Sequence, residues 1–181
     1  MNEDRRTARF EEQVLVHLDS AYNLARWITR DDGAARDAVQ DGCLQAFVAF
    51  DQMHGSNARA WFLAVIRNTC IDLLRKRRGR SVEDEYREDL HGGGDALNAA
   101  VTATPEDIAS RASDAEWLRA CIDGLPRDFR EVIVLRELEE LSYKEISAIV
   151  EIPIGTVMSR LARGRDLLQR RMLVAHKRSQ R

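Results

Sequence analysis

The sequence predicts an all-α protein made of two small helical domains joined by a flexible linker, the C-terminal domain being a helix-turn-helix. Three observations predict this fold class. Apolar residues recur at helical spacing through most of the chain. The 181 residues include only three prolines and ten glycines, with 6% aromatic side chains, which favours helices over a strand-rich sandwich. A glycine-containing acidic stretch without sustained periodicity separates the two periodic blocks.

The N-terminal domain is expected over residues 10–79, with three helices. The first apolar stripe comprises Val14, Leu18, Tyr22 and Ala25. After a break at residues 31–33, the second comprises Val39, Cys43, Ala46 and Phe50. The turn-rich segment 51–57 reads as a loop. A long third helix then follows over 58–78, with its apolar side at Phe62, Val65, Thr69 and Leu73.

Residues 80–104 are expected to form the linker, which contains an acidic run and three consecutive glycines. A partly ordered surface loop is the alternative for this segment. Thr104 and Pro105 then provide a capping side chain and a first-turn proline. The C-terminal domain is expected over 105–172 with four helices, followed by a basic tail at 173–181.

The helix-turn-helix is predicted within residues 125–168. Ser142 and Glu145 have the spacing of a capping box, and the following helix has an apolar face at Leu141, Ile146, Ile149 and Val150. Pro153 breaks that helix and suits the first turn of the next. The apolar side of the last helix is predicted at Ile154, Val157, Leu161, Gly164 and Leu168.

The other sides of this last helix carry short polar groups and arginines, namely Thr156, Ser159, Arg160, Arg163 and Arg165. Such a helix suits the major groove of DNA. The helix pair alone leaves DNA binding open, because amphipathic helices with a proline turn occur in many helical proteins and surface arginines often only contact solvent.

Charge is strongly segregated although the formal net charge is only −2. Residues 75–80 form a basic run, and from residue 160 onward seven further arginines and lysines follow Arg160 against the single acid Asp166, whereas residues 83–89 are acidic. This asymmetry favours a polyanionic partner for the basic segments.

Several classes of protein are disfavoured. The sequence lacks an apolar run of membrane-spanning length and a signal-peptide core, so a cytoplasmic protein without membrane insertion is expected. Cys43, Cys70 and Cys121 form no CxxC pair and read as buried free thiols. The four histidines have no metal-ligand spacing. We expect no metal, no cofactor and no catalytic residue, and therefore not an enzyme.

Both blocks resemble bacterial sigma factors of the extracytoplasmic-function branch of the sigma-70 family. The strings LPRDFREVIVLREL, LSYKEISAIV and IPIGTVMSRLARGRDLL resemble the family's promoter-reading C-terminal domain, region 4. The strings DAVQDGCLQAF and ARAWFLAVIRNTCIDLLRKRR resemble its N-terminal domain, region 2. The resemblance implies a protein that binds core RNA polymerase, recognises the −10 and −35 promoter elements and promotes DNA melting.

The resemblance also assigns roles by position. Core polymerase docking falls on Asp37, Gln40, Asp41, Leu44 and Phe47, with core packing as the alternative for Phe47. At the −10 element, the loop that captures a flipped base corresponds to Met53, His54 and Gly55, with Asn68 on the base pocket and Trp61 as its support; core packing is the alternative for Trp61. Phosphate contacts there fall on Arg67, Arg75, Lys76, Arg77 and Arg78. At the −35 element, contacts to the DNA backbone fall on Arg136, Tyr143, Thr156 and Arg165, and contacts to base edges fall on Met158, Ser159, Ala162 and Arg163.

Three positions depart from the family pattern. Met53 stands where the family's loop often carries an aromatic residue, and Met158 and Ala162 stand where relatives often place larger readers. These departures leave the promoter sequence open. The partners implied are the clamp helices and flap of core polymerase, promoter DNA and an anti-sigma factor. A stand-alone helix-turn-helix regulator is the alternative, although it leaves the string over 58–78 unexplained. An enzyme and a polymerase-binding antagonist are weaker readings.

Overall fold

The structure is a computed structural model that describes residues 2–53, 57–88 and 114–179. These residues form helices and contain no strand, which confirms the all-α prediction. The α-helices are α1 (Asn2–Gln13), α2 (Leu18–Thr29), α3 (Asp32–Ala49), α4 (Ala58–Glu88), α6 (Asp114–Asp123), α7 (Arg127–Ile133), α8 (Tyr143–Val150) and α9 (Ile154–Ser179). Shorter elements are the 3₁₀ turns η1 (Leu15–His17) and η2 (Phe50–Gln52) and the π-helical turn η3 (Val134–Leu138).

The N-terminal domain is built on the mutual packing of α2, α3 and α4. Arg30 ends α2 in the left-handed conformation, at φ 58°, and the Asp31 carboxylate accepts a hydrogen bond from the Ala34 amide at 2.6 Å to begin α3. Small residues line the buried side of α3. At Gly42, an added Cβ would lie 2.6 Å from Cδ1 of Ile66, so a side chain there would require the Ile66 side chain to move.

A helix precedes the predicted domain boundary. The apolar stripe suggests a start near residue 10, whereas α1 begins at Asn2. Most of α1 is polar and exposed, so it carries no strong periodic signal. Phe10 is buried and Val14, just beyond the helix, is fully buried, and these two side chains anchor the helix to the domain.

The C-terminal domain forms the predicted helix-turn-helix. Both hydrogen bonds of the Ser142–Glu145 capping box are present. Glu151 ends α8 in the left-handed conformation, at φ 59°. Val157, Leu161 and Gly164 of α9 are buried as predicted. Ile154 is a correction: its side chain is 45% exposed, because it lies in the first turn of α9 beyond the edge of the buried face.

Two helices are longer than the sequence pattern indicates. The third helix of the N-terminal domain was predicted to end near Arg78, but α4 continues to Glu88, so residues 80–88 of the expected linker are helical. The last helix was predicted to end near Met172, but α9 continues to Ser179. Residues 89–104 of the linker and the helix start at Thr104–Pro105 lie outside the described residues.

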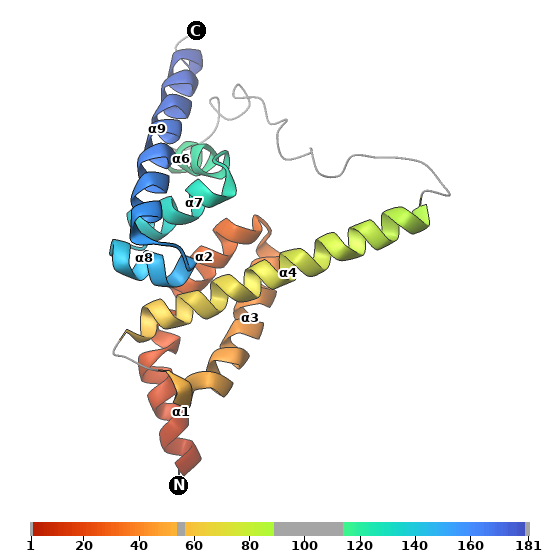
Figure 1. Cartoon of the computed structure of the whole chain (residues 1–181), viewed down its shortest axis with the longest axis vertical. Coiled ribbons are helices and arrows are strands. Elements are labelled where there is room, and N and C mark those ends of the chain that lie inside the picture. Colours follow the sequence, from red (N-terminus) through yellow and green to blue (C-terminus); the bar gives the residue numbers. More distant parts are fainter. Residues whose placement is uncertain (1, 54–56, 89–113, 180–181) are drawn as a thin grey trace.

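The two domains pack directly against each other (Figure 1). Helix α8 lies against α4, and α7 lies against α2. Buried apolar side chains of both domains form one continuous core. Local periodicity carries no information about contacts between distant segments, so the relative placement of the domains is not predictable from the sequence pattern.

Candidate nucleic-acid interface

Helix α9 presents the predicted base-reading side chains on its solvent side. Met158 is 54% exposed, and Ser159, Ala162 and Arg163 are also exposed. Thr156 is half-buried, and its carbonyl accepts a hydrogen bond from the Ser159 hydroxyl at 3.0 Å. The opposite side of the helix is packed on α7 and α8. A helix held from behind with an open polar face can enter a major groove.

Three residues predicted to contact the DNA backbone lie close together beside the exposed face of α9. The guanidinium of Arg136 lies 5.4 Å from the centre of the Tyr143 ring and donates to the Leu141 carbonyl at 2.8 Å. Arg165 donates to one carboxylate oxygen of Glu137 from two nitrogens, at 2.9 and 2.6 Å. The hydrogen bond to Glu137 raises the pKa of Arg165. A DNA phosphate that binds Arg165 therefore has to replace an acid of the same domain.

Helix α4 carries the predicted −10 contacts in two different settings. The described side chains from Arg75 to Arg77 are exposed: Arg75 pairs with Asp72 at 3.6 Å, and Arg77 pairs with Asp31 at 3.8 Å. Asn68 is exposed and Trp61 is half-buried. The side chain of Arg78 lies outside the described residues, as do His54 and Gly55 of the predicted base-capture loop. Met53, the first residue of that loop, is half-buried.

The near half of α4 is engaged by acids of the C-terminal domain. Arg67 pairs with Glu131 at 2.6 Å, and the two side chains are only 13% and 3% exposed. Arg59 pairs with Glu139 at 2.7 Å and also donates to the Glu139 carbonyl at 2.9 Å. Arg67 further donates to the amide oxygen of Asn68 at 3.3 Å. A predicted phosphate contact, Arg67, is thus occupied within the protein.

The contact between the domains also includes the Ser142–Glu145 capping box of α8. Asn57 caps α4, because its side-chain oxygen accepts from the Ala60 amide at 2.9 Å, and its side-chain nitrogen donates to Glu145 at 2.5 Å. Hydrogen bonds from Ser142 lower the pKa of Glu145, with a smaller contribution from Asn57. The end of the predicted base-capture loop and the start of the helix-turn-helix therefore share one carboxylate.

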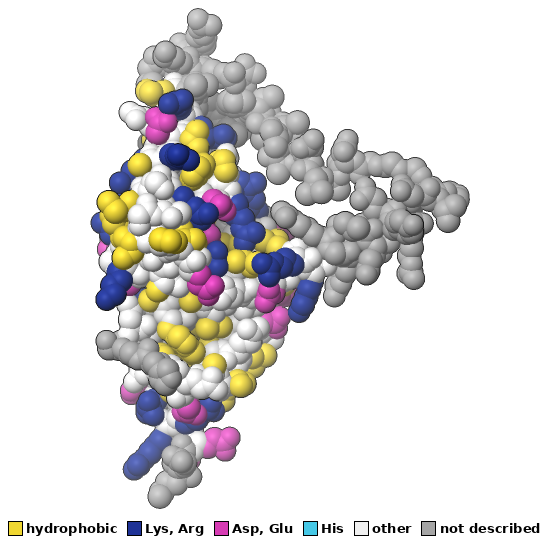
Figure 2. All heavy atoms as spheres, in the orientation of Figure 1, with side chains coloured by type: hydrophobic (Ala, Val, Ile, Leu, Met, Phe, Trp, Pro, Cys, Tyr) yellow, Lys and Arg dark blue, Asp and Glu magenta, His cyan; other side chains and the backbone are white. Residues whose placement is uncertain are grey.

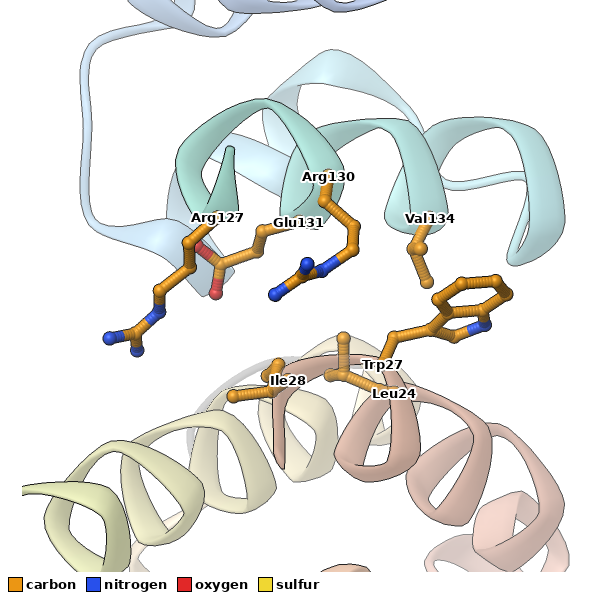
Figure 3. A pocket seen from close by; sticks show the side chains of 7 residues that line it. All are labelled: Leu24, Trp27, Ile28, Arg127, Arg130, Glu131 and Val134. Carbon is orange, nitrogen blue, oxygen red and sulfur yellow. The ribbon is translucent and has the colours of Figure 1, made fainter. Parts of the chain in front are cut away.

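A pocket lies at the contact between the domains, where α2 faces α7 and the first residue of η3 (Figure 3). It is lined by Leu24, Trp27, Ile28, Arg127, Arg130, Glu131 and Val134. Arg130 is 5% exposed, and burial lowers its pKa to about 10. Its guanidinium donates to the carbonyls of Asp123 and Leu125 at 3.0 and 3.3 Å. Arg30, from the N-terminal domain, donates to the same Asp123 carbonyl. Arg130 therefore has a structural role at this contact.

The predicted docking residues lie together on α3. Asp37, Gln40, Asp41 and Leu44 are all exposed. Phe47 is half-buried, and its ring packs edge-on against Phe10 with centroids 5.1 Å apart. One exposed apolar side chain on the same helix, Val48 at 77%, is absent from the sequence-based set. Val48 follows Leu44 by one helical turn, a spacing that could have identified it.

On the face drawn in Figure 2, the basic side chains of the described residues do not form one continuous patch. Figure 2 shows Lys and Arg over the C-terminal domain and along α4, interspersed with acidic and apolar side chains.

Within the described residues, no group of three or more His, Cys, Asp or Glu side chains could hold a metal ion. No helix in that part of the chain is long and apolar enough to cross a bilayer. Burial raises the pKa of Cys43, Cys70 and Cys121, that of Cys70 to about 12.

Comparison with known proteins matches both domains. Residues 14–80 match Sigma-70 region 2, and residues 115–168 match Sigma-70, region 4. The ECF RNA polymerase sigma factor SigE of Mycolicibacterium smegmatis is 32% identical over 160 residues, which cover 88% of this chain and 60% of that protein. The ECF RNA polymerase sigma-E factor of Escherichia coli K12 is 32% identical over 145 residues, covering 77% of this chain and 74% of that protein.

The overall arrangement also matches a solved structure. The sigma factor RpoE of Bartonella quintana, in complex with the anti-sigma factor NepR, superimposes with a TM-score of 0.71 and 28% identity. The match covers 92% of this chain and 98% of that one, so it includes both domains.

Proposed function

The chain belongs to the extracytoplasmic-function branch of the sigma-70 family, the RNA polymerase sigma factors, and we propose that three of its surfaces have different roles in transcription initiation. The exposed side of α3 binds core polymerase. Helix α4 with Met53 recognises and opens the −10 element, and α9 reads the −35 element. The exposed row Met158, Ser159, Ala162 and Arg163 on a helix packed from behind is the observation that carries this proposal.

The chemistry of each surface supports its role. Arginine can donate two hydrogen bonds to the O6 and N7 atoms of guanine, so exposed Arg163 suits a base contact. Asn68 offers both a donor and an acceptor to an unpaired base. The basic end of α4 supplies phosphate contacts that place the duplex. Polar side chains around Leu44 on α3 suit a partner surface of mixed character.

The domain contact adds a condition to this proposal. While Glu131 and Glu139 hold Arg67 and Arg59, the near half of α4 faces protein rather than DNA. Binding of core polymerase therefore has to separate the domains or exchange these ion pairs before α4 can engage the −10 element. The free protein is then a poor binder of a complete promoter.

Transcription in vitro with core polymerase tests the roles proposed for these surfaces. Asp41→Lys should weaken holoenzyme assembly without unfolding the protein, because Asp41 is exposed. Asp19→Lys, an equally exposed carboxylate on α2, is the matched control. Equal affinity of core for the Asp41 variant and the wild type would reject the α3 docking surface.

A second arm tests promoter opening. Asn68→Ala should impair melting of the −10 element while binding of a −35 duplex is kept, because Asn68 is remote in sequence from α9 and exposed on α4. Reactivity of unpaired thymines with permanganate reports melting. Unchanged reactivity would remove Asn68 from the proposal.

We also propose that an anti-sigma factor covers these surfaces. The Bartonella quintana neighbour was solved with such a partner, and exposed Leu44 and Val48 offer apolar contacts. A pull-down from unstressed cells should recover a stoichiometric partner other than polymerase. Recovery of polymerase alone would favour control through the amount of the protein. The stand-alone regulator is not favoured, because both sigma regions match, and we assign the chain no catalytic reaction of its own.

A further inference from the structure

Helix α1 lies across the corner where α3 ends and η2 begins (Figure 1). This corner lies between two proposed surfaces. Leu44 and Phe47 precede it on the docking helix, and Met53 follows it as the start of the predicted base-capture loop. The Met53 amide donates to the Phe50 carbonyl at 3.1 Å, so η2 sets the direction in which the chain leaves the corner.

Arg6 of α1 makes three contacts at this corner. Its Nε donates to the Asp51 carboxylate at 2.8 Å, and its terminal nitrogen donates to the Phe47 carbonyl at 2.5 Å. The guanidinium also lies 4.4 Å from the centre of the Phe47 ring. The side chain is 26% exposed, so water only partly screens these contacts.

The chemistry of the Phe47 carbonyl explains why an arginine suits this place. Phe47 lies in the last turn of α3, where carbonyls lack helical partners and carry partial negative charge. The Phe50 amide already donates to the Phe47 carbonyl, as the C-cap of α3. Arg6 supplies a second, charged donor and joins that carbonyl to Asp51 in η2, across the point where the helix changes type.

Aromatic contacts hold α1 in the position that this requires. Phe10, one turn after Arg6, packs edge-on against both Phe47 and Phe50, at 5.1 and 5.3 Å between ring centroids. Arg9 adds a contact 5.4 Å from the centre of the Phe50 ring. The aromatic contacts explain the attachment of α1 and leave the polar geometry of the corner to Arg6.

We propose that Arg6 is a positioning residue for −10 recognition. It fixes the junction of α3 and η2, and thereby the place of Met53 relative to α4, so that docking on α3 and base recognition beyond η2 act as one rigid unit. This inference rests on the proposed function of Met53 and α4, and it adds α1 to the promoter-opening apparatus without requiring α1 to touch DNA.

The test uses the full chain assembled with core polymerase on two promoter forms. One is duplex, and the other is unpaired across the −10 element. Arg6→Ala should reduce open-complex formation on the duplex about ten-fold, comparable to loss of a charge-assisted hydrogen bond. On the unpaired promoter it should reduce the preference for the favoured −10 base over a substituted one, while core affinity and −35 duplex binding stay at wild-type values.

Matched variants separate positioning from general stability. Arg5→Ala removes an exposed arginine from the same helix and should behave as wild type. Arg6→Lys keeps the charge but cannot reach both Asp51 and Phe47 in a fork, so it should restore part of the base preference. Asp51→Asn should show a smaller loss than Arg6→Ala, because the Phe47 contacts remain.

The outcomes are distinct. Unchanged base preference in Arg6→Ala overturns the inference, and so does an equal loss of core binding, −35 binding and melting, which would indicate a merely structural residue. If Arg6→Ala lowers thermal stability, the Asp51→Asn and Arg6→Lys results on the unpaired promoter decide between the two readings. If the wild-type chain with core shows no −10 preference at all, the proposed function fails, and the inference fails with it.

Discussion

The two helices that carry the proposed promoter contacts, α4 and α9, hold their arginines in opposite ways. On α9, Arg163 is exposed, and Arg165 is paired with an exposed acid of its own domain. On α4, Arg67 is paired with an acid of the other domain, and both side chains are almost fully buried. A phosphate can displace Glu137 from Arg165 without moving the domains. It can reach Arg67 only after the domains have moved.

The difference indicates an order of events. The proposed −35 contacts on α9 are available in the packed protein, whereas part of the proposed −10 surface on α4 becomes available only after a rearrangement. Domain separation costs free energy, and binding of core polymerase is the step proposed to supply it. Substitutions on both helices and at their partners test this difference, and the largest effect is expected from the buried ion pair.

The largest effect is expected from removing a buried partner. Glu131→Ala leaves Arg67 buried without a counter-charge, which should lower the free energy of unfolding by about 3–5 kcal/mol or open the domain contact instead. Glu137→Ala removes an exposed partner and should cost only about 0–1 kcal/mol. Urea denaturation measures the first quantity, and small-angle X-ray scattering detects opening. Similar small effects for both variants would remove the distinction between the helices.

The next effect concerns DNA. Arg163→Ala should weaken binding to the −35 element by about 1–3 kcal/mol and relax the preference at one base pair. Arg165→Ala should weaken all sequences alike and lower the salt slope of binding by about one unit. Arg170→Ala, an exposed arginine further along α9 that pairs with Asp166, is the control. Selection on randomised −35 sequences measures the preference, and an unchanged preference in the Arg163 variant would falsify its base-reading role.

A smaller effect is expected from acid. Hydrogen bonds from Ser142 lower the pKa of Glu145 in the folded protein. The ionised carboxylate therefore stabilises the fold above its ordinary pKa of 4.5, and this stabilisation is lost as pH falls through the lower folded value. Ser142→Ala should cost about 1 kcal/mol at neutral pH and flatten this acid dependence. Stability curves of the two proteins between neutral pH and acid should converge as pH falls; parallel curves would contradict the assignment.

The smallest effect is expected at the far end of α4. Arg75 is exposed, and among the described residues it pairs only with Asp72, so Arg75→Ala should change the free energy of unfolding by less than about 0.5 kcal/mol. Binding of holoenzyme to all promoters should nevertheless weaken, with a salt slope lower by about one unit. The Arg75 and Glu131 variants thus separate DNA contact from domain contact on the same helix. A large loss of stability in the Arg75 variant would show that this half of α4 is also engaged.

Local signals were read correctly from the sequence, and distant contacts were not. The Ser142–Glu145 capping box and the buried faces of α8 and α9 follow from residues a few positions apart. Helix α1 is missed by the apolar pattern, because Phe10 and Val14 are the two buried apolar side chains that attach an otherwise polar segment. Ile154 was placed in the core because periodicity does not indicate where the covering helices end.

The site shows the same limit. The exposed rows on α3 and α9 agree with the positions predicted from the family resemblance, although their roles remain predictions. Arg67 shows why the sequence is insufficient here. Its position on the helix would be the same whether its side chain contacted DNA or paired with Glu131. The acids that occupy Arg59 and Arg67 lie more than sixty positions away. No local pattern marks Glu131 or Glu139 as their partners.

The three buried or half-buried thiols have a consequence for how a cell can signal to this protein. Thiolate, not thiol, reacts with peroxide and with disulfides. Burial raises the pKa of all three thiols, that of Cys70 to about 12, so little thiolate is present at neutral pH. We therefore expect peroxide to leave the three cysteines unmodified under conditions that oxidise an exposed cysteine, as measured by mass spectrometry of the cysteine-containing peptides. An oxidative stress that controls this sigma factor would then act on a partner that carries the reactive group.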